Sequence, residues 1–120
     1  MRQVDIIGVG ITAFGKHPEK SLQELGSIAA LEAIKDAGIK PYEVGAGFYA
    51  NALSGRLFGE FTPGQNVLWE VGINRVPIVN VENACTSSSS AFHLAWTGVA
   101  AGMYDAAIVV GAEKMFVPGF

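Results

Sequence analysis

The apolar residues of the chain fall into short runs whose spacing alternates between strand-like and helix-like. The strand-like runs are continuous or β-branched, are bounded by glycine or proline, and span residues 4–9, 46–52, 77–81 and 106–111. The runs with helical spacing cover residues 21–38, 63–71 and 87–102. Continuous apolar strands that alternate with helices are typical of parallel sheets buried on both faces. The pattern therefore predicts an α/β fold with a mostly parallel sheet and helices on both faces.

The first helical run carries its own start and stop signals. Ser21 and Glu24 have the spacing of a capping box, in which each side chain accepts a hydrogen bond from the other residue's backbone amide. Gly38 and Pro41 follow the last apolar position and are expected to end the helix. The stretch Arg56–Pro63, by contrast, shows neither strand-like nor helix-like spacing of apolar residues and is predicted to be a loop.

The helix predicted over residues 87–102 has a stripe of small side chains. The stripe consists of Ser87, Ala91, Ala95, Gly98 and Gly102. Small side chains permit close approach of a second backbone. No other stretch of the chain offers a matching surface, so we expect a partner helix that lies outside this sequence.

Composition and charge exclude several classes of protein. The 120 residues are 50% apolar and 16% charged, which suits a single core rather than several domains. The net charge of -3 comes without a basic stripe, so we expect no nucleic-acid partner. Charged residues interrupt every apolar stretch before about 18 residues, and the N-terminus lacks the layout of a signal peptide. We therefore expect a soluble, cytoplasmic protein with no membrane insertion.

The segment from Gly8 to Ala13 matches the G-x-G-x-x-A spelling of a dinucleotide fingerprint. That fingerprint requires a helix to begin directly at the glycine turn, so that its amino end faces a pyrophosphate. In this chain the first signal for a helix start is the capping box at Ser21. We therefore interpret the glycines as a tight turn that leaves the first strand.

The other residues capable of chemistry are interpreted as structural. His17 and His93 are each predicted to be surface or structural histidines. Glu113 and Lys114 form a predicted solvated pair near the carboxyl edge of the sheet, and both tryptophans are expected in the core. No His, Cys, Asp or Glu cluster has metal-ligand spacing, so we predict no metal.

Cys85 is the single cysteine and follows the predicted strand 77–81, directly before the predicted helix 87–102. A lone cysteine forms no internal disulfide, so it is either a small core residue or a reactive thiol. Unpaired amides and the dipole at a helix amino terminus stabilise a thiolate and can hold an oxyanion. The carboxyl edge of a parallel sheet is also where open α/β folds bind ligands. Position alone leaves both interpretations of Cys85 open.

Three segments of the chain resemble the thiolase superfamily in their amino-acid sequence and in their order along the chain. They are Asp5–Lys16, Val81–Ser87 and Gly111–Met115. The first and last resemble the sterol-carrier or lipid-transfer-like branch, and the middle one is also similar to archaeal acetyl-CoA acetyltransferases. The resemblance implies that residues 1–120 are a partial thiolase N-terminal domain, part of the N-terminal half of a thiolase-like fold. The C-terminal half, with its histidines and second acid/base group, would be absent. The chain departs from the family where Ser87 and Ser88 replace a frequent glycine.

The resemblance also implies a chemistry. Cys85 would be the nucleophile that forms an acyl-thioester, with its backbone amide stabilising the oxyanion. Substrates would be coenzyme A thioesters, with no bound cofactor, in Claisen condensation or thiolytic cleavage of 3-oxoacyl-CoA. The isolated chain would be inactive, because it lacks the bases. A non-catalytic subunit that binds lipid or acyl-CoA, or acts as a scaffold, stays open as the alternative, whereas the cysteine disfavours a thiolase-like aldolase.

The strand Pro77–Val81 bears on assembly. In the sheet order that the resemblance implies, this strand lies at an edge, and an exposed apolar edge invites pairing with another chain. Pro77 costs little at the first position of an edge strand. We therefore expect a homodimer of the complete protein through Pro77–Val81.

Overall fold

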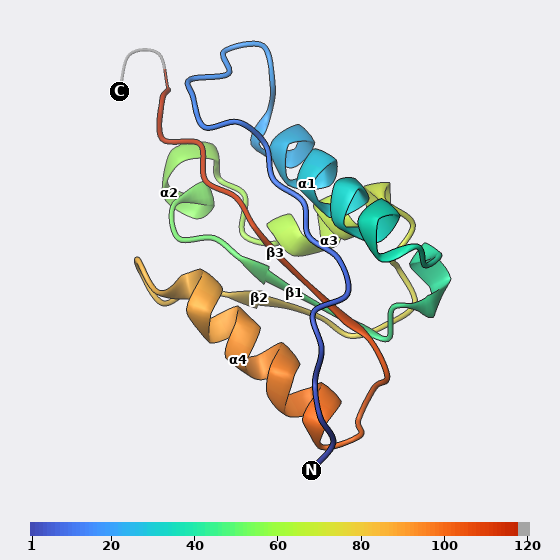
Figure 1. The fold of residues 1–120 in the computed structure, drawn as a ribbon. Helices are drawn as coiled ribbons and strands as arrows, with labels where there is room; N and C mark the ends of the chain where they lie inside the picture. The colour runs from blue at the N-terminus through green and yellow to red at the C-terminus, as the bar shows by residue number, and fades with distance from the viewer. Residues whose placement is uncertain (118–120) are drawn as a thin grey trace.

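The computed structural model describes residues 1–117 as a three-stranded sheet with helices on both faces (Figure 1). In chain order the elements are α1 (Leu22–Ala37), the short 3-10 helix η1 (Pro41–Glu43), β1 (Ala46–Ala50), α2 (Ser54–Phe58), α3 (Pro63–Glu70), β2 (Ile78–Val81), α4 (Ser87–Ala100) and β3 (Ala107–Gly111). The strands lie in the order β2-β1-β3, and both pairings are parallel. The predicted α/β fold class is confirmed.

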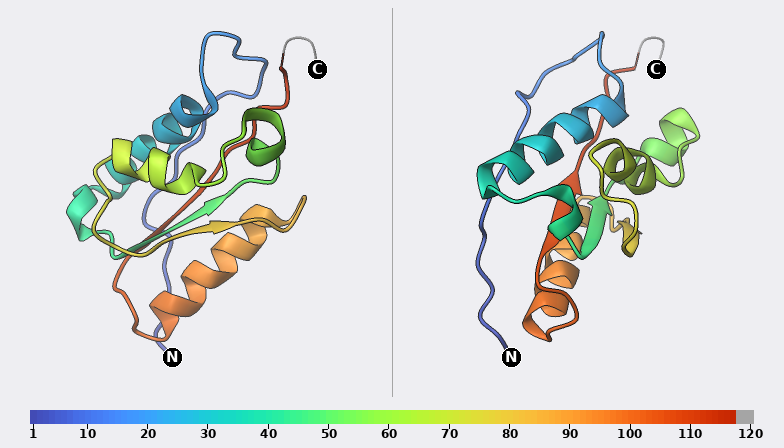
Figure 2. Two further views of the ribbon diagram at one scale, coloured as in Figure 1. Left: turned by 180° about the vertical axis from the view of Figure 1, so that it is seen from behind. Right: turned by 90° about the vertical axis from the view of Figure 1, so that its right-hand side faces the viewer.

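The central strand β1 supplies side chains to a core on each side of the sheet. On one face Tyr49 packs in the core formed with α1 and α3, where Leu68 is fully buried. On the other face Phe48 packs against Ala91 and Ala95 of α4. Figure 2 shows α4 on one side of the sheet and α1 with α3 on the other. Burial of β1 on both faces explains its continuous run of apolar and aromatic residues.

The start and stop signals predicted for α1 are confirmed. The Ser21 hydroxyl accepts the Glu24 amide at 3.0 Å, and the Glu24 carboxylate accepts the Ser21 amide at 3.3 Å. Gly38 closes the helix with φ 69°, a left-handed conformation that favours glycine. The helices predicted over 63–71 and 87–102 also form, as α3 and α4.

The small-residue stripe of α4 packs on this chain's own sheet. Ala91 is 0% exposed and lies against β1, and a side chain at Gly98 would collide with the Tyr104 ring. We predicted that the stripe packs against a helix outside this sequence, and this prediction is wrong. The stripe packs instead against small residues of β1, including Ala46 and Ala50. The larger side chains of α4 are exposed instead.

Two other predictions from the sequence are also wrong. Trp69 and Trp96 are 67% and 42% exposed, because α3 and α4 bury the small or aliphatic side chains on their other faces. The predicted loop Arg56–Pro63 includes part of α2, whose start is held by contacts from a distant part of the chain described below.

Residues 4–9, predicted as the first strand, form no strand within the described chain (Figure 1). The segment is anchored at its start, where the Arg2 amide donates to the Ala100 carbonyl at 2.9 Å and the Arg2 guanidinium pairs with Asp105 at 2.8 Å. A cavity of about 630 Å³ lies between this segment and β3. The strand prediction fails because a strand needs an adjacent backbone to pair with, and residues 1–117 place none beside this segment.

The glycines of the segment pack against α1. A side chain at Gly8 or Gly10 would collide with the helix backbone at Ala33 or Ala29. No helix begins at these glycines, since α1 starts at Leu22, and the tight turn predicted for them is wrong. Close packing on a helix accounts for both glycines. None of the helices within residues 1–117 has the length and hydropathy needed to cross a bilayer.

Candidate functional site

Cys85 lies in the connection between β2 and α4, and its side chain is exposed. The connection leaves the carboxyl end of β2 and enters the amino end of α4, as predicted. Within residues 1–117, therefore, Cys85 is not part of the core. A thiol at this place is accessible to a ligand at the carboxyl edge of the sheet.

The turn that presents Cys85 has an unusual backbone. Ala84 has φ 49°, a left-handed conformation that costs energy for a residue with a Cβ. The buried Ser87 hydroxyl spans the turn, since it donates to the Ala84 carbonyl at 2.7 Å and accepts the Asn83 amide at 2.8 Å. The Thr86 hydroxyl donates to the Asn83 carbonyl at 2.8 Å. The hydroxyls of Thr86 and Ser87 therefore bind the backbone of the turn and hold it.

The end of β3 meets the first turn of α4. A Cβ built on Gly111 would lie 2.5 Å from the Ser88 hydroxyl oxygen. Because glycine has no Cβ, Gly111 leaves room for the Ser88 hydroxyl, and the end of β3 lies beside the first turn of α4.

The predicted solvated pair of Glu113 and Lys114 is wrong, because each side chain makes its own contacts with distant backbone. The Glu113 carboxylate accepts the Ala52 amide at 2.6 Å and the Leu53 amide at 3.2 Å, directly before α2. It also accepts the side-chain amide of Asn51 at 2.9 Å. Glu113 thus stabilises the start of α2 through hydrogen bonds and through its charge at the helix amino end.

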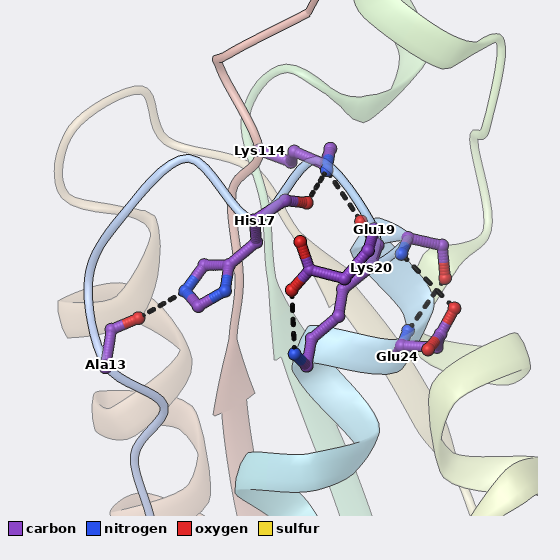
Figure 3. A network of polar contacts seen from close by, with 7 residues as sticks. Ala13, His17, Glu19, Lys20, Glu24 and Lys114 are labelled. Atoms are coloured by element: carbon purple, nitrogen blue, oxygen red, sulfur yellow. Dashed lines mark hydrogen bonds and ion pairs between the residues drawn. The ribbon is translucent and has the colours of Figure 1, made fainter.

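Lys114 points to the loop before α1 (Figure 3). Its ammonium group donates to the carbonyl oxygens of His17 and Lys20 at 2.5 and 2.6 Å. The His17 ring nitrogen lies 2.5 Å from the Ala13 carbonyl oxygen in the same loop. His17 therefore has the structural role predicted for it.

No catalytic base reaches Cys85 in the part of the chain that the structure describes. His93 is exposed on α4, and none of the hydrogen bonds of residues 1–117 joins the thiol to a histidine or a carboxylate. The same residues contain no group of three or more His, Cys, Asp or Glu side chains that could hold a metal ion.

Sequence reasoning did not single out Asn51 or Ala84. Asn51 is 8% exposed and follows β1, while Glu113 follows the neighbouring strand β3. Parallel neighbours end at the same edge, so the ends of the two predicted strands were the signal that could have found this pair. No sequence signal marks Ala84, because alanine rarely adopts a left-handed backbone.

Comparison with known proteins places residues 4–117 in one family. Those residues match the sequence model described as "Thiolase, N-terminal domain". A curated relative, the benzoylsuccinyl-CoA thiolase subunit BbsB of Thauera aromatica, is 42% identical over 115 residues, which are 94% of this chain and 28% of the relative. Sterol carrier protein 2 of Gallus gallus is 34% identical over 117 residues, which are 95% of this chain and 20% of the relative.

A solved structure with the same fold is the acetyl-CoA acetyltransferase of Syntrophomonas wolfei. It superposes with a TM-score of 0.78 at 24% identity and covers 87% of this chain, but only 27% of the solved chain. The chain thus spans less than a third of the length of each of these proteins.

Proposed function

Because the chain belongs to the thiolase N-terminal domain family, we propose that it forms the nucleophile-bearing part of a thiolase-type acyl-CoA acyltransferase. Cys85 is the residue that carries the acyl group. The observation that supports this assignment is the exposed thiol at the junction of β2 and α4, in a turn that the Ser87 hydroxyl braces. The substrates are coenzyme A thioesters.

The reaction proceeds in two transfers. The Cys85 thiolate attacks the thioester carbonyl of an acyl-CoA, and the coenzyme A thiolate leaves, so that the acyl group is held as an enzyme thioester. The acyl group then passes to the carbanion of a second acyl-CoA, as in Claisen condensation, or to free coenzyme A in thiolysis. The Cys85 amide contributes to stabilising the oxyanion in each tetrahedral intermediate.

The complete protein needs a second part. Residues 1–117 bring no base to Cys85, and the chain covers 28% of the length of BbsB. We assign the bases that activate Cys85 and the second substrate to a C-terminal part, so residues 1–120 are a partial domain. The isolated 120-residue chain should show negligible condensation or thiolysis.

The proposal is tested by intact-mass measurement of the complete protein after incubation with acetyl-CoA. We expect one acetyl group per chain, released by free coenzyme A. The Cys85→Ser variant should gain none, whereas Ser89→Ala, at an exposed residue in the first turn of α4, should be acetylated like the wild type. An acetyl group that persists in Cys85→Ser would rule out Cys85 as the carrier.

The alternative is a non-catalytic subunit that binds acyl-CoA or lipid, or acts as a scaffold. Its expected signature is binding of acetyl-CoA, measured by calorimetry, without any acetylated protein. A thiolase-like aldolase remains disfavoured, because carbon-carbon cleavage of that kind needs no acyl-thioester on the enzyme.

A further inference from the structure

We propose that Glu82 is a positioning residue for acyl transfer at Cys85. Its carboxylate holds the left-handed turn at Ala84, and that turn leaves the Cys85 amide free to face the oxyanion of the substrate. The inference rests on the proposed acylation of Cys85 and adds a residue to it. Glu82 acts through the conformation of Ala84 rather than by contact with the substrate.

The peptide unit before the Ala84 Cα is held at both of its ends. The Ala84 amide donates to the Glu82 carboxylate at 2.6 Å. The carbonyl of the same unit, which belongs to Asn83, accepts the Thr86 amide at 3.0 Å and the Thr86 hydroxyl at 2.8 Å. The plane of this peptide unit is therefore fixed from two directions.

The next peptide unit, between Ala84 and Cys85, is held at one end. Its carbonyl accepts the Ser87 amide at 3.2 Å and the Ser87 hydroxyl at 2.7 Å. None of the hydrogen bonds within residues 1–117 uses the Cys85 amide. Because a trans peptide directs its carbonyl and its amide to opposite sides, this amide points away from Ser87. Of the four backbone groups around Ala84, it is the one left to bind a substrate oxygen.

Glu82 is the contact that ties the turn to the strand before it. Thr86 and Ser87 lie at the amino end of α4, whereas Glu82 comes directly after β2. The left-handed Ala84, with φ 49°, costs energy because it has a Cβ. A hydrogen bond from an amide to a carboxylate is charge-assisted and offsets part of that cost. Without the Glu82 contact, the amide of Ala84 loses its partner and the turn loses its support from the strand side.

The structure also separates the oxygen of Glu82 from its charge. A carboxylate beside this turn opposes both a thiolate at Cys85 and an oxyanion at the Cys85 amide, because like charges repel. Its charge therefore does not assist the transfer. A positioning role requires only an oxygen that accepts the Ala84 amide, so glutamine should replace Glu82.

The rate of Cys85 acetylation in the complete protein tests this role. Glu82→Ala should lower the rate at saturating acetyl-CoA at least about tenfold and change the half-saturating concentration less than about twofold. Glu82→Gln should keep the rate within about threefold of the wild type. Glu70→Ala, at an exposed residue of α3, is the matched control and should react like the wild type. A Glu82→Gln variant as slow as Glu82→Ala would contradict the positioning role.

A second substitution tests whether Glu82 acts through Ala84. Glycine adopts a left-handed backbone without the cost that a Cβ imposes, so adding Ala84→Gly to Glu82→Ala should raise the acetylation rate at least about threefold. Alone, Ala84→Gly should change the rate less than about twofold. No recovery in the double variant would overturn the proposal.

Crystal structures of the complete protein keep this inference distinct from the proposed function. Residue 84 should be left-handed in the wild type and in Glu82→Gln, and should leave that conformation in Glu82→Ala, whether or not a thioester forms on Cys85. A left-handed residue 84 in Glu82→Ala would overturn the role of Glu82. Absence of acetylation in the wild type would instead refute the proposed function, and the crystal structures would still decide whether Glu82 holds the turn.

Discussion

The carboxylate of Glu113, two positions after β3 ends, accepts a hydrogen bond from the side-chain amide of Asn51, directly after β1, at 2.9 Å. Asn51 in turn accepts the Ser54 amide at 2.7 Å through its side-chain oxygen. Together with the Ala52 and Leu53 amides bound to Glu113, these contacts order the chain between β1 and α2. The carboxyl edge of the sheet is thus a connected network rather than a set of independent loops.

Neutralising Glu113 should weaken this network. We expect Glu113→Gln to lower the free energy of unfolding by about 1–2 kcal/mol, since it replaces charge-assisted hydrogen bonds with weaker ones at a partly exposed site. Urea denaturation measures the change, and faster tryptic cleavage after Arg56 would report loosening of α2. Glu70→Gln, at an exposed residue of α3, should change stability by less than about 0.5 kcal/mol. Equal effects in the two variants would contradict the network.

The Tyr49 hydroxyl should be destabilising. Tyr49 is 0% exposed, and its hydroxyl has no hydrogen-bond partner among residues 1–117. Because a buried polar group without a partner costs about 1–3 kcal/mol, Tyr49→Phe should raise the free energy of unfolding by about 1 kcal/mol. Tyr42→Phe, at a residue that is 83% exposed, should have no effect. A loss of stability in Tyr49→Phe would mean that a water or another group satisfies the hydroxyl.

The same tyrosine should make stability depend on alkaline pH. Burial, and then the nearby carboxylates of Glu113 and Glu60, raise the pKa of Tyr49 well above its ordinary value. Above about pH 10 an unfolded tyrosine loses its proton, whereas folded Tyr49 keeps it. The free energy of unfolding is therefore unaffected by this titration below about pH 10 and falls by about 1.4 kcal/mol per pH unit above it. Urea midpoints from pH 9 to 11 should show this fall in the wild type and in Tyr42→Phe, and a smaller fall in Tyr49→Phe.

Dimerisation through β2 remains a proposal that the structure makes testable. β2 is an edge strand in the described sheet, and Val79 is 41% exposed. In the complete protein, Val79→Lys should give monomers in sedimentation velocity, because a lysine on the edge opposes strand pairing. Acetylation of Cys85 should fall with it, since β2 leads directly into the Cys85 turn. Leu31→Lys on the outer side of α1 should stay dimeric, and a dimeric Val79→Lys would exclude this interface.

The elements predicted correctly are those whose signals are local. The capping box of Ser21 and Glu24 lies within one turn, so α1 could be bounded from the sequence. The start of α2 could not, because it depends on Glu113, which lies about sixty residues later. The apolar pattern of residues 4–9 is typical of a strand, but it carries no information on whether another strand lies beside it to pair with.

For the candidate site, the sequence located Cys85 at the junction of strand and helix but not the conformation that presents it. The left-handed Ala84 and the Ser87 hydroxyl across the turn depend on how α4 meets the sheet. The small-residue stripe illustrates the same limit, since side-chain size shows that Ala91 packs closely but not which surface it packs against.

The free edge of β3, which borders the cavity of about 630 Å³, has a consequence for biosynthesis. A ribosome releases the N-terminal part of a protein first, and domains begin to fold as they emerge. During that interval the edge of β3 that does not pair with β1 would present backbone groups to the crowded cell, where they are a template for aggregation. The yield of folded protein should thus depend on how soon the C-terminal part is synthesised, and expression of both parts from one message is favoured over mixing them afterwards.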